Sequence, residues 1–350
     1  MVNRNTGSLL PRFRRPHVVI LGAGASRAAF PEGDANGRAV PLMDDLVSFL
    51  ELERLFADFG LEVCDRNFET LYSIISTSGT DPQLVARVEE RVSEYFSSFK
   101  LPDELTLYDR LVLSLRPKDL IATFNWDPFL WEALNRNASY APMPQVVHLH
   151  GNVAVGHCTR HKPMSEGWRG RTCRRCGAQF VPSRLLFPVS VKNYTNDPAI
   201  SISWQVLECA MKSAYLFTIF GYRAPDTDVE AKQLLKRGWG NEDSRSQEEI
   251  EIIDVRHEDD LRATWRDFIH THHYHVVDNF DQSVAGHFPR RSCEAEGERL
   301  IEANEDLRPQ PMPDYANRSD VRSWVRPLLD QESEFDRESA ARRIAHPSSV

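Results

Sequence analysis

The stretch that most constrains the fold of this chain is HVVILGAGASRAAFP, at residues 17–31. Four apolar residues, 18–21, are followed at once by Gly22 and Gly24 and then by small residues. A short apolar run of this kind indicates a strand buried on both faces. The glycines permit a sharp turn into a helix and let a ligand approach the backbone. Because N–H groups at such a helix start face a diphosphate, the stretch predicts a nucleotide-binding β-turn-α unit.

The motif is incomplete as a dinucleotide fingerprint. A full G-x-G-x-x-G needs a third glycine where this chain has Arg27. Standing alone, the stretch fits a tight turn in an ordinary α/β sheet equally well. The following residues, 30–41, are rich in Gly, Pro, Asp and Asn and predict a loop. That loop is interpreted either as a lid over the ligand or as a plain surface loop.

Strand and helix patterns alternate along the rest of the chain. Apolar residues at three- and four-residue intervals predict an all-helical insertion over 42–118. Further apolar runs predict strands, with helices between them, at 119–125, 145–151, 213–222, 250–255 and 274–280. The alternation predicts an α/β fold with a parallel sheet covered by helices on both faces.

The two ends of the chain depart from this pattern. Residues 1–16 carry several arginines and predict a solvated N-terminal arm, with contact to an acidic partner as the alternative. After about residue 285 the periodicity fades into prolines and a mixed-charge tail, which predicts a partly disordered extension over 286–350. The main domain is therefore expected over 17–285.

Composition excludes several classes of protein. A formal net charge of −9 argues against direct nucleic-acid binding by the body of the chain. No apolar stretch approaches the length of a membrane span, and no secretion signal is recognisable. With six cysteines and no such signal, a reducing, cytoplasmic location is expected.

Four residues of types that bind metal ions fall within 152–182. Cys158 and His161 form one knuckle, and Cys173 and Cys176 form a second after eleven intervening residues. Two such knuckles suit tetrahedral Zn²⁺, and because all four positions are protein ligands, the zinc site is expected to be structural. The alternative is a loop with reduced thiols. His157 is a second choice of ligand, but its spacing does not fit a knuckle.

Polar side chains follow three of the predicted strands. The first strand ends in GAGAS, the second in Thr123, Asn125 and Asp127, and the third in His148 and His150. Ligands of open parallel sheets bind at the carboxyl ends of the strands, so these side chains should converge. Asp127 has a structural alternative as a helix cap. His148 and His150 alternate on one strand face, so one of them has a structural alternative in packing.

The motifs GAGAS, T-x-N-x-D, L-H-G, the Cys/His cluster and G-Y…D, in this order, resemble the sirtuin (SIR2) superfamily over about 18–277. The resemblance is closest to bacterial SIR2-like proteins of antiphage defence, which have a helical insertion and GYRAPDTD-like stretches. It implies a Rossmann-like fold that binds NAD⁺ and carries a small zinc-binding module. It also implies a homo-oligomer or a partner protein of a defence system.

The resemblance assigns roles to individual residues. Asn125 and Asp127 would lie by the nicotinamide ribose, and His150 would be the base. A neutral imidazole that accepts a proton from water or a hydroxyl accelerates a reaction by ~100- to 10,000-fold. An amide orients such a water without titrating. The implied dinucleotide contacts are Gly22, Ala23, Gly24, Ala25, Ser26, Thr123, Gly221, Tyr222, Asp228 and, toward the adenosine ribose, Asp254.

Two departures from the family separate this chain from protein-deacylating sirtuins. Those members follow the glycine turn with an Ala-Gly-Ile-Pro-Asp-Phe-Arg type of loop, whereas this chain has AFPEGDANGRAVPLMDDL. The stretch SRLLFPVSVKNY lacks the Val-x-Phe-Gly-Glu pattern that pairs with an acyl-lysine peptide. These departures favour an NAD⁺ glycohydrolase that releases nicotinamide and ADP-ribose, and the resemblance implies a role in antiphage defence by NAD⁺ depletion. The alternatives are an NAD⁺-dependent protein deacylase and a non-catalytic module that binds NAD⁺ or ADP-ribose.

Overall fold

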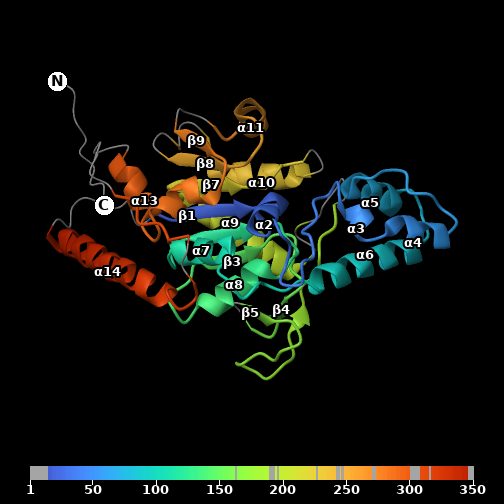
Figure 1. Ribbon diagram of the computed structural model, residues 1–350, viewed down its shortest axis with the longest axis horizontal. Coiled ribbons are helices and arrows are strands. Elements are labelled where there is room, and N and C mark those ends of the chain that lie inside the picture. Colours follow the sequence, from blue (N-terminus) through green and yellow to red (C-terminus); the bar gives the residue numbers. More distant parts are fainter. Residues whose placement is uncertain are drawn as a thin grey trace.

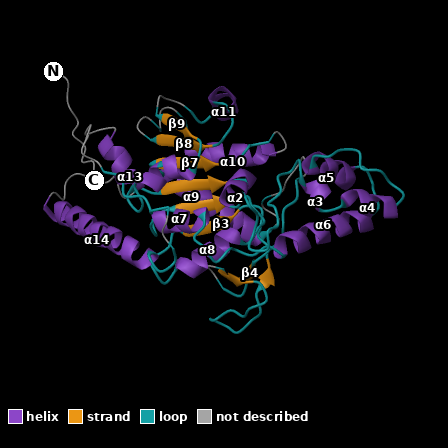
Figure 2. Cartoon of the chain, in the orientation of Figure 1, coloured by secondary structure: helices purple, strands orange, loops and turns teal. Residues whose placement is uncertain are grey.

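The computed structural model describes residues 15–161, 164–188, 194, 197–225, 228–241, 245, 248–269, 273–299, 308–314 and 317–345. Its centre is a parallel sheet of order β3-β2-β1-β7-β8-β9 (Figures 1 and 2). This order is the arrangement of a Rossmann-like fold, so the predicted fold class is confirmed. The strands are β1 (His17–Leu21), β2 (Leu120–Thr123), β3 (Gln145–His148), β7 (Leu216–Phe220), β8 (Glu249–Ile253) and β9 (Tyr274–Val277).

Alternating side chains of β1 reach two separate layers of the core, as strand geometry requires. Val18 and Ile20 pack in the cluster under α9 (Pro198–Ser213), α10 (Val229–Trp239) and α11 (Glu258–Trp265). Val19 and Leu21 pack in the cluster on the opposite face, under α2 (Ala23–Ala29), α7 (Leu107–Ser114) and α8 (Phe129–Asn137). The strand is buried on both faces, which explains its unbroken apolar run.

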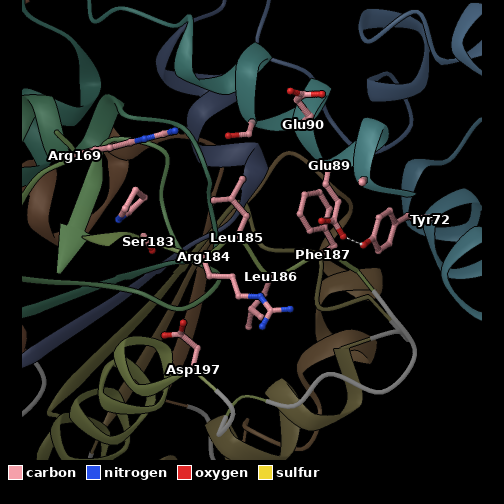
Figure 3. Close-up of a pocket in the computed structure, with 13 residues that line it drawn as sticks. Tyr72, Glu89, Glu90, Arg169, Ser183, Arg184, Leu185, Leu186, Phe187 and Asp197 are labelled. Carbon is pink, nitrogen blue, oxygen red and sulfur yellow. Dashed lines mark hydrogen bonds between the residues drawn. The ribbon is translucent and has the colours of Figure 1, made fainter. Parts of the chain in front are cut away.

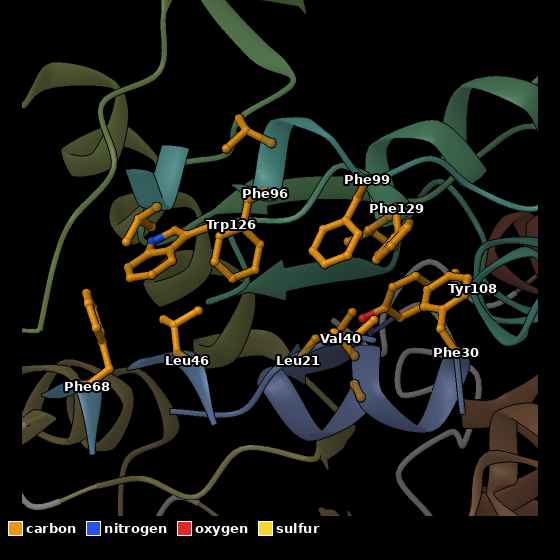
Figure 4. Close-up of a cluster of buried hydrophobic side chains, with 14 of the residues drawn as sticks. Leu21, Phe30, Val40, Leu46, Phe68, Phe96, Phe99, Tyr108, Trp126 and Phe129 are labelled. Atoms are coloured by element: carbon orange, nitrogen blue, oxygen red, sulfur yellow. The ribbon is translucent and has the colours of Figure 1, made fainter. Parts of the chain in front are cut away.

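The helical insertion comprises α3 (Leu46–Phe49), α4 (Leu52–Asp58), α5 (Phe68–Thr77), α6 (Pro82–Ser97) and α7. In Figure 1, α3–α6 project beyond one end of the sheet. Their aromatic residues belong to the same cluster as α8 and β1, and Figure 4 shows Phe68, Phe96 and Trp126 in it. Most aromatic rings of the insertion are therefore core residues, whereas Phe49 of α3 is exposed.

The loop at 30–41 is fixed in place by a buried carboxylate. Asp34 accepts hydrogen bonds from the backbone N–H of Asn36, Arg38 and Lys100 at 2.9–3.0 Å. The carbonyl of Ala39 accepts a hydrogen bond from the Tyr95 hydroxyl. The loop is thus attached to the end of α6. Leu42 and Met43, just after the loop, line a cavity at the carboxyl ends of the parallel strands, which is described below.

A three-stranded antiparallel sheet lies within 152–182, where the sequence indicated only irregular structure. Its strands are β4 (Val155–Cys158), β5 (Ser165–Trp168) and β6 (Val181–Pro182), in the order β5-β4-β6. They are too short and too rich in glycine to show an alternating pattern. Gly167 is required by packing, since a Cβ there would lie 2.3 Å from the Phe180 ring.

After the last strand the chain forms η3 (Phe280–Gln282), α12 (Val284–His287), α13 (Ser292–Gly297) and α14 (Val321–Ala345). Val321 and Val325 of α14 pack with Leu113 of α7. Arg116 is bound by Glu294, Glu332 and Asp336. The predicted arm lies outside the described residues, except for its last two, and so do 300–307, 315–316 and 346–350 of the extension. Among the described residues, no helix is long and apolar enough to cross a membrane.

The edge strand β9 is joined to β8 by a charged cluster. His275 contacts Glu249 through Nδ1 at 3.3 Å and Glu251 through Nε2 at 3.0 Å. Glu251 is fully buried and also accepts from Thr218 and from the backbone N–H of Val284. Burial alone would lower the pKa of His275, but the two carboxylates raise it from 6.5 to about 10. The positively charged His275 therefore links β9 to its neighbour β8 through two ion pairs.

This cluster predicts a pH-dependent contribution to stability. Because the folded pKa is raised, the contribution is fully present below the unfolded pKa of about 6.5 and is lost as pH rises through about 10. Hydrogen bonds to charged groups contribute about 1.5–3 kcal/mol, so His275→Gln should lose free energy of unfolding on the order of 2 kcal/mol at pH 6. Urea denaturation at pH 6, 8 and 10 measures the difference, which should shrink with pH. A constant difference would contradict the assignment, and His257→Asn, at an exposed helix start, is the control.

Candidate active site

A cavity of about 400 Å³ opens at the carboxyl ends of the parallel strands. Residues from the ends of β1, β2, β7 and β8 line it, as expected for an open parallel sheet. Four of the predicted site residues, Ala25, Ser26, Thr123 and Asp127, are not among its lining residues. The predicted residues that do line it are Gly22, Ala23, Gly24, Asn125, His150, Gly221, Tyr222, Asp228 and Asp254.

The glycine turn is in direct backbone contact with the turn after β7. A Cβ on Gly22 would lie 2.5 Å from the carbonyl oxygen of Gly221, and one on Gly24 would lie 2.9 Å from the Gly221 Cα. The N–H groups of Gly22 and Gly24 donate to the carbonyls of Phe220 and Gly221. These two N–H groups, expected from the sequence to face a diphosphate, are therefore bonded within the protein. A larger residue at Gly24 would therefore clash with the backbone of Gly221 whether or not a ligand is bound.

Asn125 lies at the floor of the cavity in a buried polar network. Its Nδ2 donates to the Gly22 carbonyl and to Ser26 Oγ, both at 2.9 Å. Ser26 Oγ donates to Asp127 Oδ2 at 2.7 Å. Asp127 Oδ1 also accepts from the N–H of Phe129 at the start of α8. Asp127 thus bonds the first residue of α8, as in the structural alternative, although the N-cap position itself is Pro128. Burial raises the pKa of Asp127 to about 6.

His150 and His148 occupy different environments. The strand β3 ends at His148, so the expected alternation does not continue to His150. His150 lines the cavity, stacks on Tyr194 and has Nε2 3.1 Å from the Tyr194 hydroxyl. His148 lies away from the cavity against Trp131, and burial lowers its pKa to about 3. Of the two histidines, only His150 is placed to meet a ligand.

Tyr222 forms one wall of the cavity. Its ring stacks on Phe124 with centroids 4.1 Å apart and planes 9° from parallel. Its hydroxyl donates to Asp228 Oδ2 at 3.0 Å, so Asp228 holds the wall in place. At the end of β8, Asp254 forms a 2.8 Å ion pair with Arg256, which also lines the cavity.

Sequence reasoning missed the residues that the helical insertion contributes. Asn67 and Glu69 of the α5 start line the cavity together with Arg223. Asp44 joins two of these residues, since Oδ1 accepts from Asn67 Nδ2 at 2.7 Å and Oδ2 pairs with Arg223 at 3.1 Å. Asp44 and Arg223 are 179 positions apart in the chain, and no sequence pattern signals such a contact.

A second cavity, of about 480 Å³, lies between α6 and the segment 182–187 (Figure 3). Its walls include Tyr72, which donates to Glu89 at 2.5 Å, and Phe187, which stacks on Tyr72. None of the predicted site residues lines it, and Leu186 lines both cavities. The predicted site residues that line either of these two cavities therefore all line the first one.

The predicted zinc ligands come together in the small sheet. One donor atom each from Cys158, His161, Cys173 and Cys176 lies within 4.8 Å of every other. The sulfurs of Cys158 and Cys176 are 3.6 Å apart, and His161 Nε2 is 3.4 Å from the Cys173 sulfur. Tetrahedral Zn²⁺ with Zn–S of about 2.3 Å places its ligand atoms roughly 3.5–3.8 Å apart, close to these two distances. The four donors therefore fit a structural zinc ion, while His157 points to Glu166 instead.

We expect purified protein to carry close to one zinc per chain by elemental analysis. Structural zinc contributes on the order of 10 kcal/mol or more to local folding, so Cys173→Ser should lose the metal and make 152–182 sensitive to protease. Cys209→Ser is the matched control, since Cys209 is an exposed cysteine outside the cluster. Wild-type protein with far less than one zinc per chain would contradict the site.

Comparisons with known proteins give a distant structural likeness only. No family profile and no curated protein matches the sequence. A structure from work on the mechanism and regulation of Sir2 enzymes covers 83% of this chain and 96% of its own, with 15% identity and a TM-score of 0.40. A mutant Sir2 homologue with ADP-ribose covers 92% and 97%, with 13% identity and a TM-score of 0.37. A Sir2 homologue with NAD covers 83% and 90%, with 15% identity and a TM-score of 0.31. At such scores the function has to be argued from the residues of the cavity.

Proposed function

We propose that this protein is a sirtuin-type NAD⁺ glycohydrolase that releases nicotinamide and ADP-ribose. The observation that carries the proposal is the pairing of Asn125 and His150 in one cavity beside the glycine turn. These two residues come from the ends of β2 and β3, neighbours in the sheet, although 25 positions separate them in the chain. The order of the sequence motifs supports NAD⁺ as the substrate.

The chemistry of glycosidic cleavage fits the groups present. Loss of nicotinamide leaves positive charge on the ribose, and a nucleophile must then be oriented and deprotonated. His150 supplies a ring nitrogen that serves as the base, with Tyr194 holding the other side of the imidazole. Asn125 presents its remaining polar atom, Oδ1, as an acceptor for water or a ribose hydroxyl. Tyr222, held in place by stacking on Phe124, provides an apolar wall for a ring.

Hydrolysis is favoured over peptide deacylation by the segment after the small sheet. Phe187 stacks on Tyr72 of α5 and packs on Trp126, so the helical insertion holds the end of this segment. The backbone N–H of Leu186 is already bonded to the carbonyl of His150. A segment with its backbone bonded at Leu186 and its side chain fixed at Phe187 is a poor partner for an extended peptide, which needs a free edge. A role in antiphage defence, with control by an oligomer or a partner protein, is supported by the sequence resemblance alone.

The test is nicotinamide release from NAD⁺ with and without an acetyl-lysine peptide. We expect release without peptide, and a loss of about 100-fold or more in His150→Ala and in Asn125→Ala. Circular dichroism should show both variants folded. His257→Ala and Asn135→Ala, at exposed positions outside the cavity, are the matched controls.

Three outcomes would change the assignment. Nicotinamide release only in step with peptide deacetylation would identify a deacylase. Binding of NAD⁺ or ADP-ribose by calorimetry without any turnover would favour the binding module. Full activity in His150→Ala would remove the proposed base.

A further inference from the structure

The hydroxyl group of Tyr108 lies inside the polar network behind the cavity. Tyr108 belongs to α7 of the helical insertion and is 1% exposed, and Figure 4 shows its hydroxyl directed into the core toward Leu21. Its oxygen is 2.7 Å from Ser26 Oγ and 3.4 Å from Asn125 Nδ2. Tyr108 does not line the cavity, so any effect it has on a bound ligand passes through Ser26 and Asn125.

The hydrogen atoms of the network can be assigned by counting donors and acceptors. Asp127 has a pKa of about 6, so it is mainly ionised at neutral pH and only accepts. Ser26 has a single hydroxyl hydrogen, and it donates that hydrogen to Asp127. The hydroxyl of Ser26 must therefore accept from both Tyr108 and Asn125. Burial and the charge of Asp127 raise the pKa of Tyr108, so its phenol keeps the hydrogen that it donates.

This order of donors fixes the orientation of the Asn125 amide. Both amide hydrogens are used, one on the Gly22 carbonyl and one on Ser26. A rotated amide would place Oδ1 against the Gly22 carbonyl oxygen, and two acceptors would face each other. The oxygen of Asn125 is left as the atom available to a ligand in the cavity.

We propose that Tyr108 is a positioning residue: it acts through Ser26, whose hydroxyl donates to Asp127, to hold the Asn125 amide with its oxygen toward the cavity. This inference rests on the proposed function, because the oriented oxygen matters for an attacking water or hydroxyl. Through Tyr108, the helical insertion then contributes to the reaction. Asp127, which accepts from Ser26 behind the cavity, then helps to orient Asn125.

The test compares Tyr108→Phe with Tyr95→Phe, which loses a hydroxyl bonded to the Ala39 carbonyl in the same insertion. We expect Tyr108→Phe to lower kcat and kcat/KM equally, by about 10-fold, since orientation acts in the transition state. KM for NAD⁺ should stay within about twofold, and Tyr95→Phe should keep the wild-type kcat. Unchanged kcat in Tyr108→Phe, or a rise in KM alone, would overturn the inference.

A double-variant cycle separates positioning from general destabilisation. If Tyr108 acts through Ser26, the double variant Tyr108→Phe/Ser26→Ala should lose no more activity than Ser26→Ala alone. Independent, multiplicative losses would contradict that route. Should Tyr108→Phe not fold, Ser26→Ala carries the test by itself, and a wild-type kcat in that variant would overturn the inference.

A readout without turnover distinguishes this inference from the proposed function. In ¹⁵N-labelled protein, the side-chain amide hydrogens of Asn125 should exchange slowly with solvent, because both are bonded and buried. Exchange should be at least about 10-fold faster in Tyr108→Phe and unchanged in Tyr95→Phe. If the wild-type protein shows this pattern but does not hydrolyse NAD⁺, the proposed function fails while the positioning stands. Fast exchange in the wild type would overturn the positioning.

Discussion

The contact between two glycine turns is the constraint on which the rest of this structure depends. Gly22 and Gly24 after β1 meet Gly221 after β7 so closely that any Cβ at these positions would overlap backbone atoms. Gly221 also has a φ of +60°, which a residue with a side chain rarely adopts. This contact brings the ends of the two central strands together and places the Gly22 carbonyl where it accepts from Asn125. The floor of the cavity is therefore set by backbone packing.

Around that floor, several side chains of the cavity are held by buried hydrogen-bond partners. Ser26 and Asp127 hold Asn125, Tyr194 contacts His150, and Asp228 holds Tyr222. Such supporting contacts restrict the side chains to one geometry, which reactions sensitive to displacements of about 1 Å require. Burial has a further effect, since it raises the pKa of Asp127 without preventing ionisation at neutral pH.

The helical insertion and the small sheet have different roles. The insertion shares its apolar core with the main sheet and contributes Asn67 and Glu69 to the cavity. The small sheet has only a minor apolar cluster, which includes the metal-site residues Cys158 and Cys173. A module with so little apolar surface depends on its metal ligands for stability, whereas the insertion is stabilised by burial.

The sequence by itself determined the order of strands and helices, the four grouped zinc ligands and the polar residues at strand ends, because these depend on local periodicity and short spacings. It did not reveal the small antiparallel sheet, since strands as short as VGHC and SEGW have no recognisable period. Only the tertiary structure decided that His150 lies in the cavity while His148 packs on Trp131. It alone brought Asp44 to Arg223 and Tyr108 to Ser26, because contacts between distant segments are set by packing, which no local pattern encodes.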